Sequence, residues 1–367
     1  MLWKFLYQFS EWFFGFNVFR YITVRATLAA ITALFIALVI GPKIIALLKK
    51  HQIGEEIRIE GPDSHQKKKG TPTMGGLIIL MAVGISTLLW AEINNMYFLI
   101  IFVATMILGV VGYIDDYMKS VLKLQKGLIA KYKLTGQLGL GLIIGLIIYF
   151  HPYFEGLHSN SSVPFFKNLE IDFGIFYIPV IIFIVAGASN AVNLTDGLDG
   201  LAAGLSAVAF IAMAGIAYVS SHVKFSDYLN IIYLPGSQEV AVFCLALFGA
   251  AIGFLWYNAY PAQVFMGDTG SLALGGALGT AAVLLKKELL LILIGGIFIF
   301  EVLSVIIQTT YFKYTKRKYG EGQRIFRMAP IHHHFELKGW HEAKVVVRFW
   351  IIGILLALLS LSTFKTQ

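Results

Sequence analysis

Long apolar runs are the feature that most constrains the fold of this chain. Most of the hydrophobic residues, which make up 57% of the 367 positions, fall in runs of about 17 to 22 residues, long enough to cross the hydrocarbon core of a bilayer. Only 14% of the residues are charged, far fewer than in a soluble globular domain. The sequence therefore predicts an all-α integral membrane protein, with residues 1–367 forming a single polytopic domain.

Ten apolar segments are long enough to count as membrane spans, and an even number places both termini on the same side of the membrane. They cover approximately residues 22–41, 75–91, 97–114, 134–150, 174–191, 201–219, 239–257, 271–285, 289–311 and 346–363.

The loops that follow the odd-numbered spans share one face of the membrane. Together with Arg348 at their edge, they carry 21 of the 29 Lys and Arg residues. Because positive charge is retained on the inner side, we expect these loops to be cytoplasmic and both termini to lie on the outer, periplasmic side. Nearly every unusual polar motif falls in the same loops, so we expect an active-site cleft at the cytoplasmic boundary. These loops are residues 42–74, 115–133, 192–200, 258–270 and 312–345.

The first 20 residues are unusually aromatic and lack the basic region, apolar core and small-residue cleavage site of a signal peptide. Since Trp and Phe favour the headgroup boundary, we expect an interfacial N-terminal helix over residues 1–20.

The net charge of +8 comes from residues that flank the spans, and no aromatic-basic recognition motif is present, which argues against a nucleic-acid partner. The single cysteine, Cys244, leaves no intramolecular disulfide to form.

Two adjacent carboxylates, Asp115 and Asp116, end the third span at the inner boundary. Neighbours on a helix point about 100° apart, so these two do not chelate one ion as a simple pair. We expect one of them to face a metal ion and the other a substrate or a lysine. A solvated helix end is the alternative, because a charge at the interface costs much less than the roughly 2.5 to 3.5 kcal/mol of a helix centre.

Two further polar segments interrupt the apolar pattern. Residues 190–200 (NAVNLTDGLDG) and 256–271 (WYNAYPAQVFMGDTGS) each precede an apolar helix. Helix capping is the structural alternative, by Thr195 or Asp196 in the first segment and by Asp268 or Thr269 in the second, yet a cap accounts for one residue and not for a whole polar segment. Asp268 lies in a glycine-flanked turn, where we expect no lysine to neutralise it.

Five carboxylates in three inner loops indicate a divalent-cation site. Carboxylates and waters without thiolates suit Mg²⁺ or Mn²⁺, and Mg²⁺ usually takes one or two carboxylates together with phosphate oxygens. A phosphate-bearing substrate is the natural partner of such a site. The five carboxylates are Asp115, Asp116, Asp196, Asp199 and Asp268.

Histidines and lysines occupy other inner loops. Adjacent His332, His333 and His334 favour a polar wall contacting phosphate over a zinc site, because consecutive histidines rarely converge on one ion and no partner Cys is present. A structural role is the remaining alternative. Residues 65–76 combine three lysines with Gly and Thr, a pattern typical of positive-inside topology or attraction to anionic lipid, with phosphate binding as the alternative. Residues 119–133, with Lys123, Lys126, Lys131 and Lys133, can likewise form a lipid-headgroup patch.

As a set and in this order, the motifs resemble those of the phospho-N-acetylmuramoyl-pentapeptide transferases, a branch of the polyprenyl-phosphate N-acetylhexosamine-1-phosphate transferases. The similarity extends from about residue 16 to residue 349, nearly the whole chain. The carboxylate motifs mark the superfamily, and the triple-histidine segment with ELKGW is typical of the muramoyl-pentapeptide branch. The motifs are residues 65–76 (HQKKKGTPTMGG), Asp115-Asp116, residues 190–200, residues 265–271 (FMGDTGS) and residues 329–340 (APIHHHFELKGW).

This resemblance implies a Mg²⁺-dependent enzyme with ten spans in the cytoplasmic (inner) membrane of a bacterium. It implies transfer of phospho-MurNAc-pentapeptide from UDP-MurNAc-pentapeptide to undecaprenyl phosphate, which yields UMP and lipid I for peptidoglycan synthesis. Membrane lipid is then a partner, and the oligomeric state, a homodimer included, stays open. Because the reaction breaks a pyrophosphate, catalysis should consist mainly of positioning and charge neutralisation.

The resemblance also implies a role for each motif residue. Asp268 is the surest metal ligand, Asp116 a second one, and Asp115 the candidate base toward the lipid phosphate. That base could be dispensable, because a phosphate monoester with a second pKa of about 6 is mostly ionised at pH 7. Direct attack is favoured, and an Asp nucleophile with a covalent phospho-enzyme is the alternative.

The remaining implied roles concern substrate binding. Asn193, Asp196 and Asn258 would contact the nucleoside or the sugar, and Phe265 would stack on uracil. Phosphate contacts would come from Lys68 and from the catalytic His333. The rest of the expected substrate-binding set is Thr73, Asn190, Asp199, Gly267, Gln308, His332 and His334.

Three other functions fit parts of the pattern. A transferase of the same superfamily acting on UDP-N-acetylglucosamine would differ in residues 329–340, which are expected to recognise a peptide-bearing muramoyl group. An ion-coupled transporter would place its acids at the membrane midplane and carry an inverted repeat, whereas these acids cluster at one face and no internal repeat is found. A lipid scaffold without chemistry leaves the aspartates unexplained.

Overall fold

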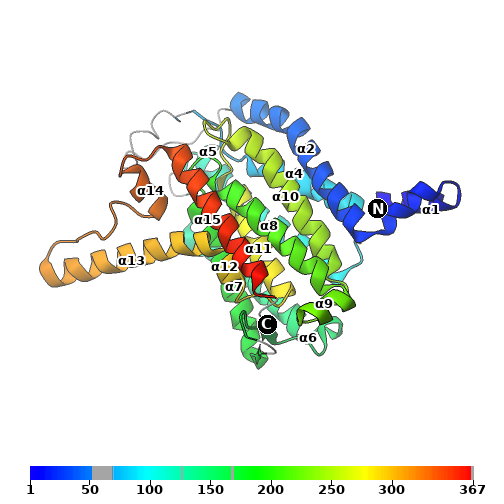
Figure 1. Cartoon of the computed structure of the whole chain (residues 1–367). Coiled ribbons are helices and arrows are strands. Elements are labelled where there is room, and N and C mark those ends of the chain that lie inside the picture. The colour runs from blue at the N-terminus through cyan, green and yellow to red at the C-terminus, as the bar shows by residue number, and fades with distance from the viewer. Residues whose placement is uncertain (52–67, 69, 125–126, 167–168, 365–367) are drawn as a thin grey trace.

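The computed structural model describes residues 1–51, 68, 70–124, 127–166 and 169–364 of the chain. Helices dominate it (Figure 1). The elements are α1 (Leu2–Gln8), η1 (Phe9–Glu11), η2 (Phe14–Arg20), α2 (Ile22–Lys50), α4 (Gly76–Trp90), α5 (Met96–Ser120), α6 (Ala130–Phe150), η3 (Pro152–Phe154), β1 (Asn160–Ser162), β2 (Glu170–Asp172), η4 (Gly174–Phe176), α7 (Tyr177–Thr195), α8 (Leu201–Ser220), α9 (Val223–Leu229), α10 (Gln238–Asn258), α11 (Gly267–Leu284), α12 (Leu291–Ile294), α13 (Gly296–Tyr319), α14 (Ile331–Glu336) and α15 (Glu342–Ser362).

Within the described part of the chain, eight helices are long and apolar enough to cross a membrane. They are α2, α5, α6, α7 with η4, α8, α10, α13 and α15. This confirms the prediction of a helical integral membrane protein. The two other predicted spans are helical as well, but α4 has only 15 residues and α11 begins with the polar sequence GDTGS.

The helix α11 lies at the centre of the bundle. All of residues 269–284 are buried, and α11 packs against α4, α5, α7 and α8, so it has no face toward lipid. Glycines let the neighbouring backbones approach closely: a methyl group at Gly112 of α5 would lie 2.1 Å from the carbonyl oxygen of Asp268, and one at Gly76 of α4 would lie 2.1 Å from the nitrogen of Gly270. Small residues at helix contacts permit such packing in membranes. The N-terminal end of α11 is therefore held against α4 and α5.

The ninth predicted span, residues 289–311, is not one helix. The short α12 ends before Gly295, and α13 begins at Gly296 and continues to Tyr319. Two consecutive glycines lower helix stability at this point, which explains the break. Figure 1 shows α13 (orange) running out of the bundle across the direction of α8 and α10. The prediction of one long loop over residues 312–345 is wrong in extent. The end of α13, all of α14 and the start of α15 lie within this range.

The N-terminal segment also differs from the prediction of one helix over residues 1–20. The α-helix α1 is followed by the 3₁₀ helices η1 and η2, consistent with the low helix propensity of aromatic residues and of Gly15. The guanidinium group of Arg25 lies 4.5 Å from the centre of the Trp3 ring and pairs with buried Glu239 at 2.6 Å. These contacts attach the N-terminal segment to the starts of α2 and α10.

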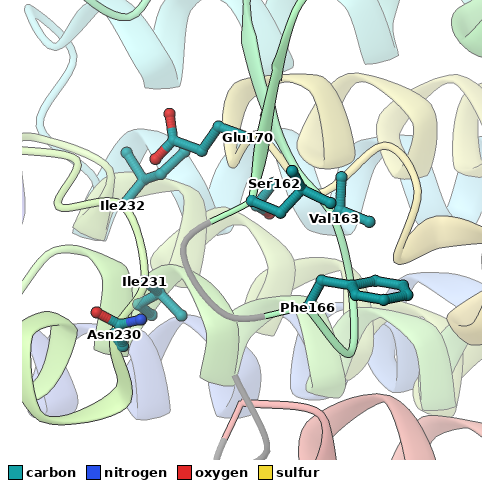
Figure 2. Close-up of a pocket in the computed structure, with 8 residues that line it drawn as sticks. Ser162, Val163, Phe166, Glu170, Asn230, Ile231 and Ile232 are labelled. Carbon is teal, nitrogen blue, oxygen red and sulfur yellow. The ribbon is translucent and has the colours of Figure 1, made fainter.

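A small antiparallel hairpin, β1 with β2, lies at the end of the bundle where α6 finishes. A pocket of about 130 Å³ lies between this hairpin and residues 230–232. Figure 2 shows the residues that line it. The hairpin follows the C-terminal end of α6, whereas the predicted carboxylate site lies near the N-terminal end of that helix. A helix of 21 residues is about 30 Å long, so this pocket is not part of the predicted site.

Candidate active site

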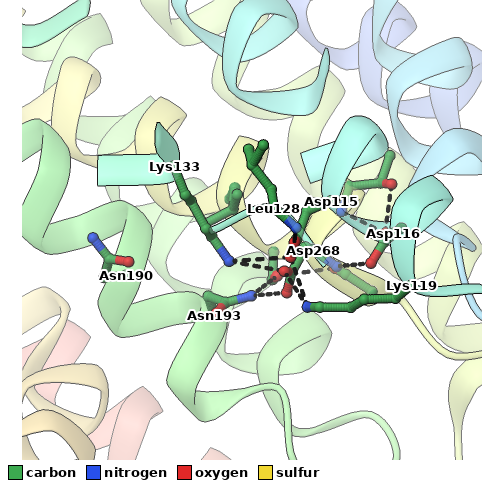
Figure 3. A network of polar contacts seen from close by, with 12 residues as sticks. Asp115, Asp116, Lys119, Leu128, Lys133, Asn190, Asn193 and Asp268 are labelled. Atoms are coloured by element: carbon green, nitrogen blue, oxygen red, sulfur yellow. Dashed lines mark hydrogen bonds and ion pairs between the residues drawn. The ribbon is translucent and has the colours of Figure 1, made fainter. Parts of the chain in front are cut away.

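Polar side chains from four helices meet at one end of the bundle (Figure 3). Asp115 and Asp116 lie in the last two turns of α5, and Lys133 lies in the first turn of α6. Asn193 comes from the last turn of α7, and Asp268 is the second residue of α11. The structure therefore brings three of the five sequence motifs together in one cluster, as their common membrane face predicts.

Asp268 is the most heavily paired carboxylate of this cluster. Its Oδ2 atom accepts hydrogen bonds from the ammonium groups of Lys119 at 2.9 Å and Lys133 at 2.8 Å. Its Oδ1 atom accepts from the amide of Asn193, which also donates to the Ser271 hydroxyl at 2.8 Å. The Asp268 side chain keeps 14% of its surface exposed, so it can be reached from outside the bundle.

Asp115 faces the same ammonium group as Asp268. Its Oδ2 atom accepts from Lys119 Nζ at 2.6 Å, and its Oδ1 atom accepts from the backbone N–H of Leu128 at 2.7 Å. The Lys133 ammonium lies 3.7 Å from Asp115 Oδ2. One cationic group thus bridges Asp115 and Asp268, which marks the space between these carboxylates as a position that suits a cation.

Asp116 points away from Asp115, as expected for neighbours on a helix. Its Oδ1 atom accepts from the backbone N–H of Asp268 at 3.0 Å, and its Oδ2 atom accepts from the N–H and the hydroxyl of Thr269 at 2.9 and 2.6 Å. Gly267 has a φ of +72°, and a methyl group there would lie 2.5 Å from Asp116 Oδ2 and 2.9 Å from the Thr73 hydroxyl. Asp116 therefore caps α11 from another helix.

Two lysines are site residues that the sequence analysis missed. The expectation that no lysine lies near Asp268 is wrong, and so is the lipid-headgroup interpretation for Lys119 and Lys133, whose ammonium groups are held by carboxylates. Lys119 follows Asp115 by four residues, the spacing of a helical ion pair, which could have revealed it. Lys133 lies on the next helix, and no local spacing connects it with Asp268.

The oxygen atoms of Asp115 and Asp268 are of the chemical kind that can hold a divalent cation. Among the described residues, no three His, Cys, Asp or Glu side chains converge on one point, so the protein alone forms no full cage. Asp115 and Asp268 present hard oxygen atoms around a single ammonium, and Mg²⁺ usually takes one or two carboxylates together with waters and phosphate oxygens. Both oxygens of Asp116, the other predicted ligand, accept hydrogen bonds from α11.

A second polar cluster surrounds Lys68. The Lys68 ammonium lies 2.7 Å from Asp199 Oδ1, 2.6 Å from Glu342 Oε1 and 5.9 Å from the centre of the Phe265 ring. Burial opposes the charge on Lys68, but Glu342 and Asp199 outweigh burial and raise the pKa of Lys68 above its ordinary value. Lys68, which the sequence predicts to meet phosphate, is thus already paired with two carboxylates of the protein.

Backbone hydrogen bonds connect three motifs around Phe265. Its N–H donates to the carbonyl of Pro72, and its carbonyl accepts from the N–H of Gly75, both at 2.8 Å. Asn258 Oδ1 accepts from the N–H of Gly200 at 3.0 Å and so ties the end of α10 to the start of α8. The segment at Phe265 is therefore fixed by the 65–76 motif, and Asn258 makes its observed hydrogen bonds within the protein.

Two other predicted substrate residues also bind the protein itself. The Asn190 amide donates to Gln137 Oε1 at 2.7 Å and so joins α7 to α6. The Gln308 Oε1 atom accepts from the backbone N–H groups of Ile325 at 3.1 Å and Phe326 at 2.9 Å, which fixes the segment after α13. In this structure these side chains hold the elements around the site together.

The triple-histidine segment forms α14. His332 is completely buried, with its Nδ1 atom 3.1 Å from Glu301 Oε2 of α13. A methyl group on Gly197 would lie 2.4 Å from His332 Nε2, so this ring sits directly against the turn that follows Asp196 at the end of α7. The His333 ring centre lies 4.1 Å from that of His332. His332 thus joins α13 and α14 to the 190–200 motif.

The other two histidines have different partners. His333 Nδ1 lies 2.8 Å from Glu336 Oε2, within the same helix. His334 Nδ1 accepts from the backbone N–H of Arg327 at 3.0 Å. Burial and the nearby charges of Lys338 and Arg327 lower the pKa of His334, which favours its neutral form. The three consecutive rings therefore do not converge on one point. This agrees with the sequence argument that adjacent histidines rarely share one zinc ion.

The fold and the paired carboxylates and lysines define a polytopic membrane protein with a polar site at one end of its bundle. Residues 98–286 match the family described as Glycosyl transferase family 4, and residues 68–80 match Phospho-N-acetylmuramoyl-pentapeptide-transferase signature 1. The chain belongs to the phospho-N-acetylmuramoyl-pentapeptide-transferase family, as its motifs predict.

Similar proteins of that name come from several bacteria. The protein of Chloroherpeton thalassium is 57% identical over 353 residues, which cover 96% of each chain. That of Thermodesulfovibrio yellowstonii is 53% identical over 367 residues, the whole of both chains. That of Chlorobium chlorochromatii is 54% identical over 351 residues, 96% of this chain and 95% of its own. The similarity is therefore not confined to the carboxylate motifs.

Proposed function

We propose that the protein transfers phospho-MurNAc-pentapeptide from UDP-MurNAc-pentapeptide to undecaprenyl phosphate, forming lipid I and UMP. The observation that carries this proposal is the cluster of Asp115, Asp268, Lys119 and Lys133 at the end of a membrane bundle whose relatives bear this name. Carboxylates suit a metal ion, and ammonium groups suit the phosphates of both substrates.

The proposed reaction exchanges one pyrophosphate for another. An oxygen of undecaprenyl phosphate attacks the phosphorus that bears the muramoyl sugar, a new P–O bond forms, and the bond between the two phosphates of the UDP carrier breaks. UMP leaves with the electron pair of that bond. We favour this direct attack over a covalent phospho-enzyme, because a phosphate monoester with a second pKa of about 6 is mostly ionised at pH 7 and so can attack without an enzyme nucleophile.

Mg²⁺ is the proposed cofactor, with Mn²⁺ as a substitute. Asp268 would hold it, with Asp115 as the neighbouring donor, and Asp116 would fix Asp268 from behind through α11. When bound, the ion would supply neutralisation of charge on the phosphate oxygens. Lys119 and Lys133 would then turn from the carboxylates toward the substrate phosphates, because their ammonium groups already lie at the same cluster.

The proton at the lipid phosphate is assigned to Asp115. A phosphate monoester with a second pKa of about 6 carries this proton only below neutral pH, so the base would matter most in acidic solution. The nucleoside and sugar are assigned to Asn193, which contacts Asp268, to Phe265, which lies beside Lys68, and to Asp196 at the C-terminal end of α7. His333 is proposed to contact phosphate from α14.

The proposed site faces the cytoplasm, where a soluble UDP-linked substrate is found. The loops that carry the motifs hold most of the positive charge of the chain, in agreement with the positive-inside rule. Ten crossings then require α4 and α11 to span the membrane in addition to the eight longer helices. The polar start of α11 is compatible with a crossing because α11 is buried inside the bundle, away from lipid. Both termini would lie outside, and the membrane would be the bacterial inner membrane.

The test is a transfer assay with purified protein and undecaprenyl phosphate in detergent micelles. UDP-MurNAc-pentapeptide and UDP-N-acetylglucosamine are supplied separately, each with a radiolabelled sugar. We expect a labelled lipid product and one UMP per product from the muramoyl substrate alone. Product from UDP-N-acetylglucosamine, or none from either donor, would overturn the proposal.

A further inference from the structure

Glu342, the first residue of α15, is a buried carboxylate without a predicted role. Its Oε1 atom accepts from the Lys68 ammonium at 2.6 Å and from the backbone N–H of Asp199 at 2.7 Å. Only 4% of its side chain is exposed. One oxygen atom of α15 thus joins Lys68 to the turn that leads into α8.

Stability alone does not call for a second carboxylate at this point. Among the residues that the structure describes, Lys68 and Asp199 already form an ion pair at 2.7 Å, and Glu342 adds a second negative charge to this pair. The Glu342 Oε2 atom is buried and, among the residues that the structure describes, has no hydrogen-bond partner. Burying an unpaired carboxylate oxygen costs free energy, which a smaller neutral side chain would avoid. The charge therefore points to a role in the site.

The neighbourhood of the cluster indicates what that role is. Asp199 Oδ2 accepts from the N–H of Ala262 at 2.9 Å, so the cluster is continuous with the segment that carries Phe265. The Lys68 ammonium faces the Phe265 ring. A lysine ammonium has three N–H donors, and Asp199 and Glu342 take two of them in fixed directions. Within the described part of the chain, the third donor is left for another acceptor.

We propose that Glu342 is a positioning residue for the nucleotide side of the site, an inference that rests on the proposed function. Glu342 acts through two groups: it fixes the direction of the Lys68 ammonium beside Phe265, and it holds the backbone of the Asp199 turn. A uridine nucleotide stacked on Phe265 then meets a donor that is already oriented. Side chains that orient metal ligands change affinity by about 10- to 100-fold when they are removed, and we expect an effect at the lower end of that range here.

Two variants at this position and one control test the inference. Glu342→Ala removes the acceptor, whereas Glu342→Gln keeps a neutral oxygen that can still accept from both donors. Glu321→Gln makes the same chemical change at an exposed site after α13. The measurements are KM for UDP-MurNAc-pentapeptide, kcat, and the dissociation constant of UMP by titration calorimetry.

We expect Glu342→Ala to raise KM and the UMP dissociation constant about tenfold, with kcat changed by less than about threefold. Glu342→Gln should give an increase of about threefold, and Glu321→Gln none. Because Glu342 acts through Lys68, adding Glu342→Ala to Lys68→Met should raise KM by much less than it does in the wild-type background.

The inference would be overturned if folded Glu342→Ala kept the KM and UMP affinity of the wild type. It would also be overturned if Glu342→Ala raised KM by the same factor in the Lys68→Met background as in the wild type. If Glu342→Ala does not accumulate as folded protein, Glu342→Gln decides, and unchanged UMP affinity there has the same meaning. Failure of the proposed function is a separate result: the wild-type protein then forms no lipid-linked product, while UMP binding and its dependence on Glu342 are still measured.

Discussion

Replacement of Asp116 by asparagine separates a structural role from metal binding. The Asp116 carboxylate accepts three hydrogen bonds from the start of α11, one from the N–H of Asp268 and two from Thr269. If these contacts define its role, Asp116→Asn should destabilise the folded protein. If Asp116 is mainly a metal ligand, the same change should leave stability intact and weaken the dependence on Mg²⁺.

The size of the loss follows from these contacts. Asparagine keeps one acceptor oxygen, and its amide group faces donors where the second oxygen was. With its oxygen toward Thr269, it loses the hydrogen bond from the N–H of Asp268. A hydrogen bond to a charged group contributes about 1.5–3 kcal/mol, and a negative charge at a helix N-terminus about 0.3–1 kcal/mol. We expect Asp116→Asn to lower the free energy of unfolding by about 2–4 kcal/mol.

The assay is unfolding by SDS titration in mixed detergent micelles, with the Mg²⁺ dependence of transfer measured in parallel. Asp227→Asn, the same change at an exposed position of α9, serves as the control and should alter stability by less than about 0.5 kcal/mol. A variant Asp116→Asn that unfolds like the wild type but needs far more Mg²⁺ would refute the capping argument and restore Asp116 as a ligand.

Three further predictions concern topology and pH. A cysteine within residues 221–237 should react with an impermeant thiol reagent in intact cells, and one within residues 316–322 should not; the reverse would overturn the proposed orientation. Asp115→Asn should lose most rate at low pH and recover partly as the lipid phosphate ionises near its second pKa of about 6. A stoichiometric burst of UMP without lipid, with a phospho-sugar adduct on Asp115, would instead show that it is the nucleophile. Burial lowers the pKa of Lys286 and Lys287 to about 8 from an ordinary value of 10.5, so the folded state binds fewer protons between these values. The free energy of unfolding should therefore rise from pH 8 to pH 10 in SDS titrations, and a falling profile would contradict this.

The membrane class was predictable because it depends on local composition. Apolar runs long enough to cross a bilayer can be read directly, and eight long apolar helices follow them. Helix ends inside polar sequence could not be read in this way, so the continuation of α13 to Tyr319 was missed. The break at Gly295 depends on backbone preference rather than on hydropathy, and a hydropathy profile does not detect it.

Within the site, helix geometry predicted that Asp115 and Asp116 face different partners, and the structure confirms this. The identity of those partners was not predictable from spacing. Lys133 reaches Asp268 across 135 positions of sequence, and Glu342 reaches Lys68 across 274. Pairs so distant are set by the packing of helices, which only the folded chain reveals.

The measurement that tests the account most directly is transfer by Asp268→Asn in proteoliposomes with undecaprenyl phosphate, UDP-MurNAc-pentapeptide and Mg²⁺. Asp268 is the carboxylate on which Lys119, Lys133 and Asn193 converge, and its side chain, unlike that of Asp116, stays reachable. We expect the variant to remain folded and to bind UMP, while its rate falls by about a thousandfold or more, as for loss of a central electrostatic group. Mg²⁺-dependent transfer within about tenfold of the wild-type rate would contradict the central claim.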